Sequence, residues 1–284
     1  MTTTAAIPLA MLLAFVFLTG AAVGSFLNVC ISRWPLNLSV VKPRSRCPRC
    51  ERSITWYENV PIVSWLALRG KCRGCRLPIS IQYPAVELGI ALLWVAAFAA
   101  FSSDWFLALR VAVFTTVLVG IAVTDLKHYL IPDGFTVFGL LWLFTTSLAA
   151  AMVGDPGMFA SPYDSLIGAC VGAGAISIIG WLGEVALGKE AMGFGDVTLM
   201  AVVGAALGPP RTLLTIFVGA AVGALVFIVF VAPIVWLRRR RAGAGGAAEL
   251  PLVPFGVFLA PAALFTLLKG DAAIAWYLSR LGLR

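Results

Sequence analysis

Charged residues are scarce in this chain: Asp, Glu, Lys and Arg together make up only 12% of its 284 residues. Soluble domains carry about a quarter of their residues as charges, so an ordinary water-soluble domain is excluded. Hydrophobic residues reach 61%, and the mean hydropathy is +0.97. The composition therefore predicts a protein that lies within a lipid bilayer.

Histidine is almost absent, which limits the kinds of catalytic site that the chain can build. The single histidine, His128, lies beside Lys127 in a polar segment, so a serine–histidine hydrolase has no further support. The two-histidine motif of zinc peptidases is missing, and so is the phosphate-binding motif of Walker type. One Gly-rich run, residues 242–246, follows four arginines and indicates a linker.

Eight apolar stretches approach the length of about 20 residues that a helix needs to cross a bilayer. They cover residues 7–30, 84–101, 106–124, 135–153, 164–187, 191–208, 212–236 and 251–268. The first has no Lys or Arg before Arg33, unlike a secretory signal, so we expect it to remain as a membrane helix. The sequence thus predicts an all-α polytopic membrane protein with about eight transmembrane helices.

The stretches divide the chain into three expected segments. These are the first transmembrane helix (1–30), a polar insertion (31–83) and a membrane domain of seven helices (84–284). Within the last segment, 191–208 is unusually short before Pro209. A re-entrant loop there would move later basic residues to the opposite side, so we expect a short or tilted helix that begins near Met192.

Basic residues gather in the polar insertion, which holds ten Lys and Arg against two acids. By the positive-inside rule this segment is expected in the cytoplasm. Eight alternating helices then bring a second basic cluster, residues 238–241, to the same side and leave both termini outside. The net charge of +8 is explained by this topology, and we expect no nucleic-acid partner.

Two CxxC pairs occur in the polar insertion: Cys47 with Cys50, and Cys72 with Cys75, separated by 21 residues. Two such pairs can offer four thiolates to one tetrahedral zinc ion. Two disulfides or a redox pair are the alternatives, but disulfides seldom persist in the cytoplasm. Four thiolates leave no open position for water, so the zinc is expected to stabilise the insertion. The other cysteines, Cys30 and Cys170, are expected to be buried in apolar helices.

An acidic residue marks the end of two apolar segments at one expected membrane face. Asp125 follows the run 106–124, and Asp196 closes the GFGD segment 193–196. A carboxylate within a membrane protein is costly and generally marks function, although each could also be an ordinary helix-end residue. Two adjacent carboxylates can act together, one as a base toward water and the other as an acid toward a carbonyl. The pair therefore predicts aspartyl protease chemistry. A third acid, Asp133, follows Ile131-Pro132 and is expected to cap a helix instead.

Six segments occur in the order typical of the type IV prepilin peptidase family, and the chain resembles that family over nearly its whole length. They are GSFLNVCISRWP at 24–35, the paired CxxC motifs, YPAVE at 83–87, the segment from Asp125 to the IPD at 131–133, GFGD at 193–196 and VPFG at 253–256. One position departs from the pattern: Thr198 stands where family members often carry Lys. This change removes no catalytic group.

The resemblance implies that Asp125 and Asp196 are the catalytic residues of a multi-pass enzyme in the bacterial inner membrane. Its substrates would be prepilins or pseudopilins of type IV pilus or type II secretion systems. Cleavage would follow a glycine at the cytoplasmic face, and the new amino terminus would be N-methylated from S-adenosylmethionine. No residue pattern identifies the site of this donor. The alternatives are an intramembrane aspartyl peptidase without methyltransferase activity and a zinc-bearing assembly scaffold.

Overall fold

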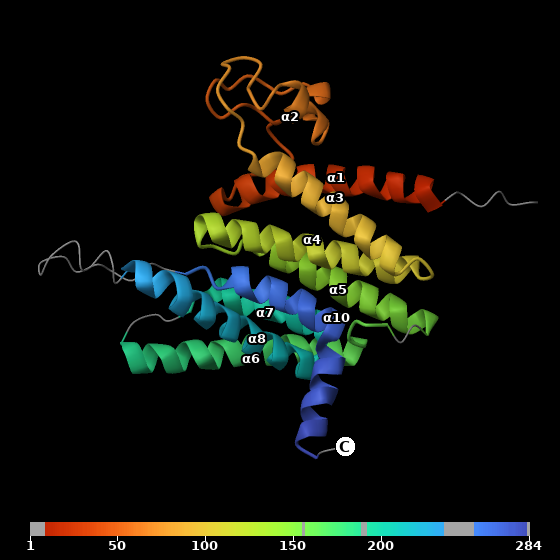
Figure 1. Cartoon of the computed structure of the whole chain (residues 1–284), viewed down its shortest axis with the longest axis vertical. Helices are drawn as coiled ribbons and strands as arrows, with labels where there is room; N and C mark the ends of the chain where they lie inside the picture. Colours follow the sequence, from red (N-terminus) through yellow and green to blue (C-terminus); the bar gives the residue numbers. More distant parts are fainter. Residues whose placement is uncertain (1–8, 155–156, 189–191, 236–252, 283–284) are drawn as a thin grey trace, which may run out of the picture. The chain divides into compact units, whose positions relative to one another are not determined.

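The computed structural model describes residues 9–154, 157–188, 192–235 and 253–282. In these residues the regular structure is helical, apart from two isolated β-bridges in the polar insertion (Figure 1). The chain divides into two compact units, Met1–Gly120 and Ile121–Arg284. The prediction of an all-α membrane protein with a polar insertion is confirmed. The three-segment division at residues 30 and 83 stays a prediction, and residues 238–241 and 242–246 lie outside the described part of the chain.

The first unit is built on two helices that run side by side, α1 (Leu9–Arg33) and α3 (Gln82–Ala100). Their close contact depends on two glycines spaced four residues apart on α1. A Cβ atom on Gly24 would lie 2.7 Å from Cα of Glu87, and one on Gly20 would lie 2.9 Å from Cα of Ala91. Small residues at this spacing let helix backbones approach closely in a membrane.

The polar insertion connects these two helices and contains little regular structure. Short helices η1 (Trp34–Leu36), η2 (Trp56–Asn59) and α2 (Val63–Ala67) are its helical elements in the described residues. The unit ends with the first part of α4 (Trp105–His128). On this part, Thr116 accepts a hydrogen bond from the indole N–H of Trp94 on α3, at 3.0 Å.

The second unit begins with the end of α4 and continues through the remaining helices. These are α5 (Asp133–Val153), α6 (Pro162–Leu187), α7 (Phe194–Leu207), α8 (Pro209–Val226) with its π-helical extension η3 (Phe227–Val231), and α10 (Gly256–Arg280). Helix α7 forms the core of this unit, because Leu199, Met200 and Val203 on it have no exposed surface. It packs tightly on α6, where Gly168 meets Gly204 and leaves no room for a side chain.

Within the described part of the chain, seven helices are long and apolar enough to cross a membrane. The eighth apolar helix, α7, has 14 residues and is therefore about 21 Å long. The expectation of about eight spans with a short sixth one agrees with this arrangement. The last helix was expected to stop at residue 268, but α10 continues to Arg280. Charged residues such as Asp271 raise the cost of burial in lipid without interrupting the backbone hydrogen bonds of a helix.

Two smaller expectations are wrong. Asp133 does not cap α5: Pro132, with extended backbone angles, occupies the cap position, and Asp133 is the first helical residue. Its carboxylate still lies near the positive end of the helix dipole. Cys30 is buried as expected, but Cys170 on α6 is exposed. In a bilayer, lipid would cover such a position.

Candidate active and metal sites

Asp125 lies in the last turn of α4, and only 6% of its surface is exposed. The start of α10 holds it: the backbone N–H groups of Gly256 and Val257 hydrogen-bond to its carboxylate. The N–H groups at the N-terminus of a helix are free to bind an acidic side chain, so this contact orients the carboxyl group. The oxygen Oδ2 is buried and has no hydrogen-bond partner among the described residues. A side chain at position 256 would collide with it, since a Cβ there would lie 2.8 Å from Oδ2.

Asp196 lies in the first turn of α7, whose cap residue Gly193 is extended. The glycine before it, Gly195, packs directly on Ile131, and a Cβ on Gly195 would lie 2.9 Å from Cβ of Ile131. The IPD segment and the GFGD segment are therefore in contact. Thr198, at the position where the sequence departs from the family pattern, donates a hydrogen bond to the carbonyl of Gly195 at 2.9 Å.

The two carboxylates belong to segments that meet at Ile131, which packs against Gly195 beside Asp196 and lies 3.3 Å from the Cβ position of Gly256, the residue that holds Asp125. Both belong to the second unit, so the fold of one unit brings them together. Two acids in this relation titrate as a pair and can hold one shared proton. The catalytic role of Asp125 and Asp196 stays a prediction. Asp133 is exposed at the start of α5.

The residues that hold Asp125 in place were missed as functional groups in the sequence. Gly256 and Val257 act through their backbone N–H groups, which every residue except proline carries, so no side-chain chemistry marks them. The sequence did indicate their position, because Gly256 belongs to the family-like VPFG segment at 253–256 and Val257 follows it directly.

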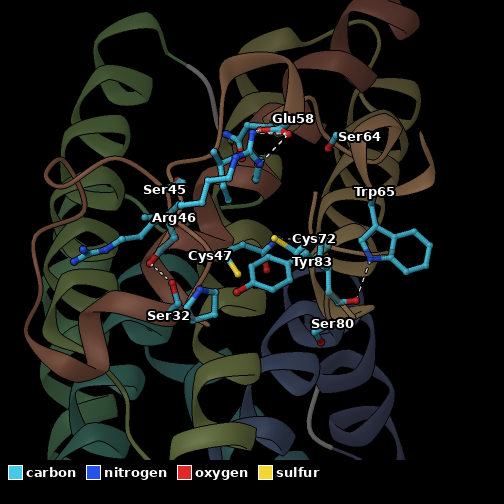
Figure 2. A pocket seen from close by; sticks show the side chains of 18 of the residues that line it. Ser32, Ser45, Arg46, Cys47, Glu58, Ser64, Trp65, Cys72, Ser80 and Tyr83 are labelled. Atoms are coloured by element: carbon cyan, nitrogen blue, oxygen red, sulfur yellow. Dashed lines mark hydrogen bonds and ion pairs between the residues drawn. The ribbon is translucent and has the colours of Figure 1, made fainter. Parts of the chain in front are cut away.

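The four cysteines of the insertion come together as the spacing predicts. Their sulfur atoms all lie within 4.8 Å of one another, with Cys47 Sγ 3.9 Å from Cys75 Sγ and Cys50 Sγ 4.0 Å from Cys72 Sγ. Tetrahedral zinc with bonds of about 2.3 Å to sulfur requires sulfur atoms about 3.8 Å apart. Figure 2 shows Cys47 and Cys72 beside each other at the centre of the insertion. The cluster can hold one tetrahedral metal ion.

The two cysteine pairs share one local structure. In each, the first cysteine donates its backbone N–H to a carbonyl five residues later, from Cys47 to Arg52 at 3.0 Å and from Cys72 to Leu77 at 2.9 Å. These turns direct backbone N–H groups at the sulfur atoms. N–H groups of Cys50 and Arg49 lower the pKa of Cys47 to about 6, and N–H groups in the second pair lower the pKa of Cys72. A thiolate is the form that binds metal.

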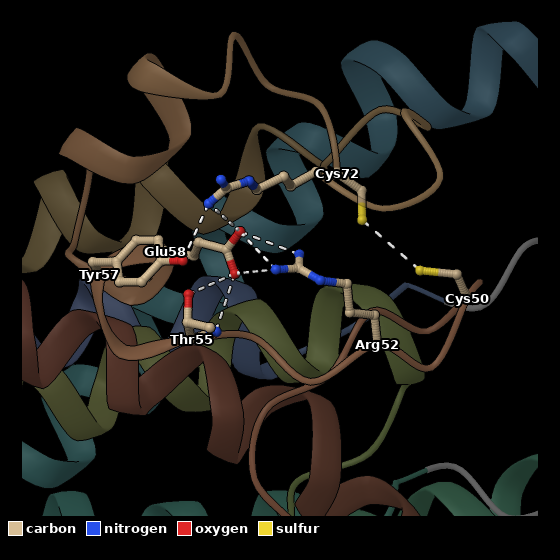
Figure 3. A network of polar contacts seen from close by, with 7 residues as sticks. Cys50, Arg52, Thr55, Tyr57, Glu58 and Cys72 are labelled. Carbon is tan, nitrogen blue, oxygen red and sulfur yellow. Dashed lines mark hydrogen bonds and ion pairs between the residues drawn. The ribbon is translucent and has the colours of Figure 1, made fainter.

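A carboxylate ties the first cysteine pair to the rest of the insertion. Glu58 accepts hydrogen bonds from the backbone and hydroxyl of Thr55, at 3.1 and 2.7 Å, and from Arg52 at 3.1 Å (Figure 3). Arg73 lies 3.7 Å from the same carboxylate and also over the ring of Tyr57. The Thr55 N–H and hydroxyl, followed by Arg52, lower the pKa of Glu58 to about 2. This network joins the two cysteine pairs through Arg52 and Arg73.

The fold and these sites define a multi-pass α-helical membrane protein with a paired-aspartate site and a four-cysteine metal-binding insertion. Comparison with known families is consistent with this class. The Type IV leader peptidase family matches residues 112–228, and the Bacterial Peptidase A24 N-terminal domain matches residues 18–101. The chain belongs to the type IV leader peptidase family.

Similar proteins carry the name prepilin leader peptidase/N-methyltransferase. The one from Myxococcus xanthus is 42% identical over 219 residues, which cover 75% of this chain and 63% of the relative. Those from Stutzerimonas stutzeri and Pseudomonas aeruginosa are 37% and 35% identical, over 95% and 98% of this chain and 95% and 97% of their own lengths. No solved structure matches the chain.

Proposed function

We propose that the chain removes the leader from type IV prepilins or pseudopilins and then methylates the new amino terminus. The observation that carries the peptidase half is the contact between the Asp125 and Asp196 segments, through Ile131, Gly195 and Gly256, in a member of this family. Full-length relatives that share over a third of their residues with the chain are named for both activities.

In the proposed hydrolysis, the two aspartates share one proton. The ionised carboxylate takes a proton from water while the water oxygen attacks the scissile carbonyl, and the protonated partner donates to the carbonyl oxygen. Collapse of the tetrahedral intermediate breaks the carbon–nitrogen bond, and the nitrogen takes up a proton to leave as an amine. The N–H groups of Gly256 and Val257 hold Asp125 in position through this cycle.

The proposed location is the bacterial inner membrane, with the site at the cytoplasmic face. A basic leader then stays on the side of the basic insertion, and the apolar helix of the pilin lies in the bilayer beside the helices of the second unit. The scissile bond of the substrate lies between its leader and its apolar helix. It would meet the site at this face, where Asp125 lies in the last turn of α4 and Asp196 in the first turn of α7. The membrane boundary therefore selects the peptide bond that reaches the aspartates.

Zinc is the proposed occupant of the cysteine cluster, held by Cys47, Cys50, Cys72 and Cys75. Thiolate ligands favour zinc over magnesium or calcium. The insertion has little regular structure, so the metal would supply much of its stability. S-adenosylmethionine is the proposed methyl donor. When bound, it would supply an electrophilic methyl group to the neutral amino terminus of the mature pilin, giving the N-methylated amine, S-adenosylhomocysteine and one released proton.

The test is cleavage of a panel of prepilins and pseudopilins by protein purified in detergent. Asp125→Asn and Asp196→Asn should each lower cleavage below a few per cent, because neither amide can take a proton from water. Asp133→Asn is the matched control, since it alters an exposed acid, and it should retain cleavage. Metal content and melting temperature show that each variant is folded. Substantial cleavage by either of the first two variants would refute the assignment.

A further inference from the structure

The first unit contains a cavity of about 620 Å³, and Cys47 and Cys72 of the metal cluster form part of its lining (Figure 2). Small-molecule sites commonly have volumes of about 300–1,000 Å³. The cavity lies between the polar insertion and the adjoining ends of α1 and α3. Its lining includes Ser25 and Asn28 of α1, Tyr83 and Glu87 of α3, and Trp65 of the insertion. Two family-like segments, 24–35 and 83–87, therefore meet at this place.

Asn28 presents an unused hydrogen-bond acceptor in this cavity. Its side chain is 3% exposed, and its amide nitrogen donates to the carbonyl of Tyr83 at 3.0 Å. The amide oxygen Oδ1 is buried and has no partner in the described residues. Because buried polar atoms are normally hydrogen-bonded, this oxygen indicates a bound group that donates a hydrogen bond.

Glu87 adds a buried carboxylate to the same lining, with 8% of its surface exposed. Its Oε2 accepts a hydrogen bond from the backbone N–H of Ile62 at 2.7 Å, and the Ser25 hydroxyl also bonds to the carboxylate. Ile62 has a φ angle of 63°, which a β-branched residue rarely adopts, so Glu87 holds the insertion in a strained turn. No Lys or Arg in the described residues forms an ion pair with Glu87. A buried carboxylate without a cationic partner favours a cationic ligand.

The remaining lining is aromatic and basic. Trp65 is held by a hydrogen bond from its indole N–H to the carbonyl of Ile79 at 3.2 Å, and Figure 2 shows it across the cavity from Arg46. Exposed basic residues at the entrance include Lys42 and Arg46. The cavity thus combines acceptors for a cation, aromatic rings and a basic entrance that suits a carboxylate.

We propose that this cavity is the binding site for S-adenosylmethionine, an inference that rests on the proposed methyl transfer. The donor is a zwitterion with a sulfonium, an ammonium, a carboxylate and an aromatic base. Its sulfonium matches Glu87, and its ammonium N–H groups match Asn28 Oδ1. Its base matches the aromatic residues of the lining, and its carboxylate matches the exposed basic residues. A basic prepilin leader would be repelled by these basic residues. A lipid phosphate would leave Asn28 Oδ1 without a donor and would bring a negative charge beside Glu87.

The experiment measures the binding of S-adenosylmethionine and S-adenosylhomocysteine to the full chain in detergent by calorimetry. The second compound lacks the sulfonium charge, so it separates charge recognition from cavity shape. Glu87→Gln keeps the size and the acceptor oxygen of the side chain. It should weaken S-adenosylmethionine binding about tenfold and change S-adenosylhomocysteine binding much less. Glu184→Gln, an exposed acid of the second unit outside the cavity lining, should change neither affinity.

A second measurement needs no variant. Ultraviolet crosslinking of radiolabelled S-adenosylmethionine to the wild type should label peptides from residues 25–33, 42–54, 58–68 or 77–87. Labels confined to residues 121–284 would overturn the assignment, even if Glu87→Gln fails to fold. So would a folded Glu87→Gln variant that binds both compounds like the wild type.

The two proposals fail in different ways. If the wild type methylates mature pilin while the cavity assignment fails either test, methyl transfer stands and the donor site is elsewhere. If the wild type cleaves prepilin but neither binds the donor nor methylates, the methyl-transfer half of the proposed function fails, and the inference fails with it. Saturable binding of short-chain anionic lipid that excludes the donor would identify a headgroup site and also overturn the assignment.

Discussion

Replacing Gly256 by alanine should disable the aspartate pair without removing any functional group. Gly256 is the first residue of α10, and its N–H holds Asp125. The new Cβ would lie 2.8 Å from Asp125 Oδ2 and 3.3 Å from Cδ1 of Ile131. Both neighbours belong to the site, because Ile131 also packs against Gly195 in the segment that carries Asp196.

The magnitude follows from the size of the collision. An ordinary carbon–oxygen contact is about 3.3 Å, so the carboxylate oxygen must move by about 0.5 Å. A displacement of about 1 Å in a catalytic group can cost about 100-fold in rate. We therefore expect Gly256→Ala to lower kcat/KM for prepilin cleavage about tenfold, with a larger effect on kcat than on KM because the substrate contacts are retained.

The assay compares cleavage rates for the wild type, Gly256→Ala and a matched control, Gly174→Ala in α6. At Gly174 a Cβ meets no atom within 4 Å, so this control tests the general effect of adding a methyl group to a membrane helix. Melting temperature and metal content show whether the variants are folded. A folded Gly256→Ala variant with activity within twofold of the wild type would show that α10 does not position Asp125.

The same reasoning separates the two glycines of the GFGD segment. Gly195→Ala should reduce cleavage by about tenfold or more, because its Cβ would lie 2.9 Å from Cβ of Ile131. Gly193→Ala should retain most activity, because a Cβ at that position meets no atom within 4 Å. Equal cleavage rates for the two variants would contradict the packing argument. Metal analysis of protein prepared without chelator should give one zinc ion per chain, and this ion should be lost in the double variant with Cys47→Ser and Cys72→Ser. Cleavage should survive in part in that variant because the cysteines belong to the first unit and the aspartates to the second; metal-free wild type would favour a redox role for the cysteines.

The residues with distinctive chemistry could be predicted from the sequence. Four cysteines in two CxxC pairs specify a tetrahedral site by spacing alone, and the structure brings their sulfur atoms together. Asp125 and Asp196 could be paired because both end apolar segments at one expected membrane face. In these cases the side chain itself would carry the proposed function, and the topology limits which residues it can contact.

What could not be predicted depends on contacts between distant parts of the chain. Gly256 positions Asp125 through a backbone N–H group, which a sequence pattern does not mark. The cavity around Asn28 and Glu87 forms only when α1 packs on α3. The cap of α5 was assigned to Asp133 because aspartate is a common cap residue, but the extended Pro132 precedes it and takes that position. Local preference was overruled there by the backbone conformation of one neighbouring proline.

The six family-like segments also separate into two groups in space, a fact that their order along the chain does not reveal. Segments 24–35 and 83–87, together with the paired CxxC motifs, meet in the first unit around the cavity and the metal cluster. The Asp125 segment, the GFGD segment and Gly256 meet in the second unit around the two carboxylates. The two family matches follow nearly the same division. The match over 18–101 lies within the first unit, and the match over 112–228 lies in the second unit except for residues 112–120. Hydrolysis needs water and two acids, and methyl transfer needs a pocket for a charged donor, so the two proposed chemistries place different demands on a fold. When each activity belongs to its own unit, a mutation can abolish one activity and leave the other. Glu87→Gln should therefore impair methyl transfer and retain cleavage, and Asp125→Asn should abolish cleavage and retain donor binding.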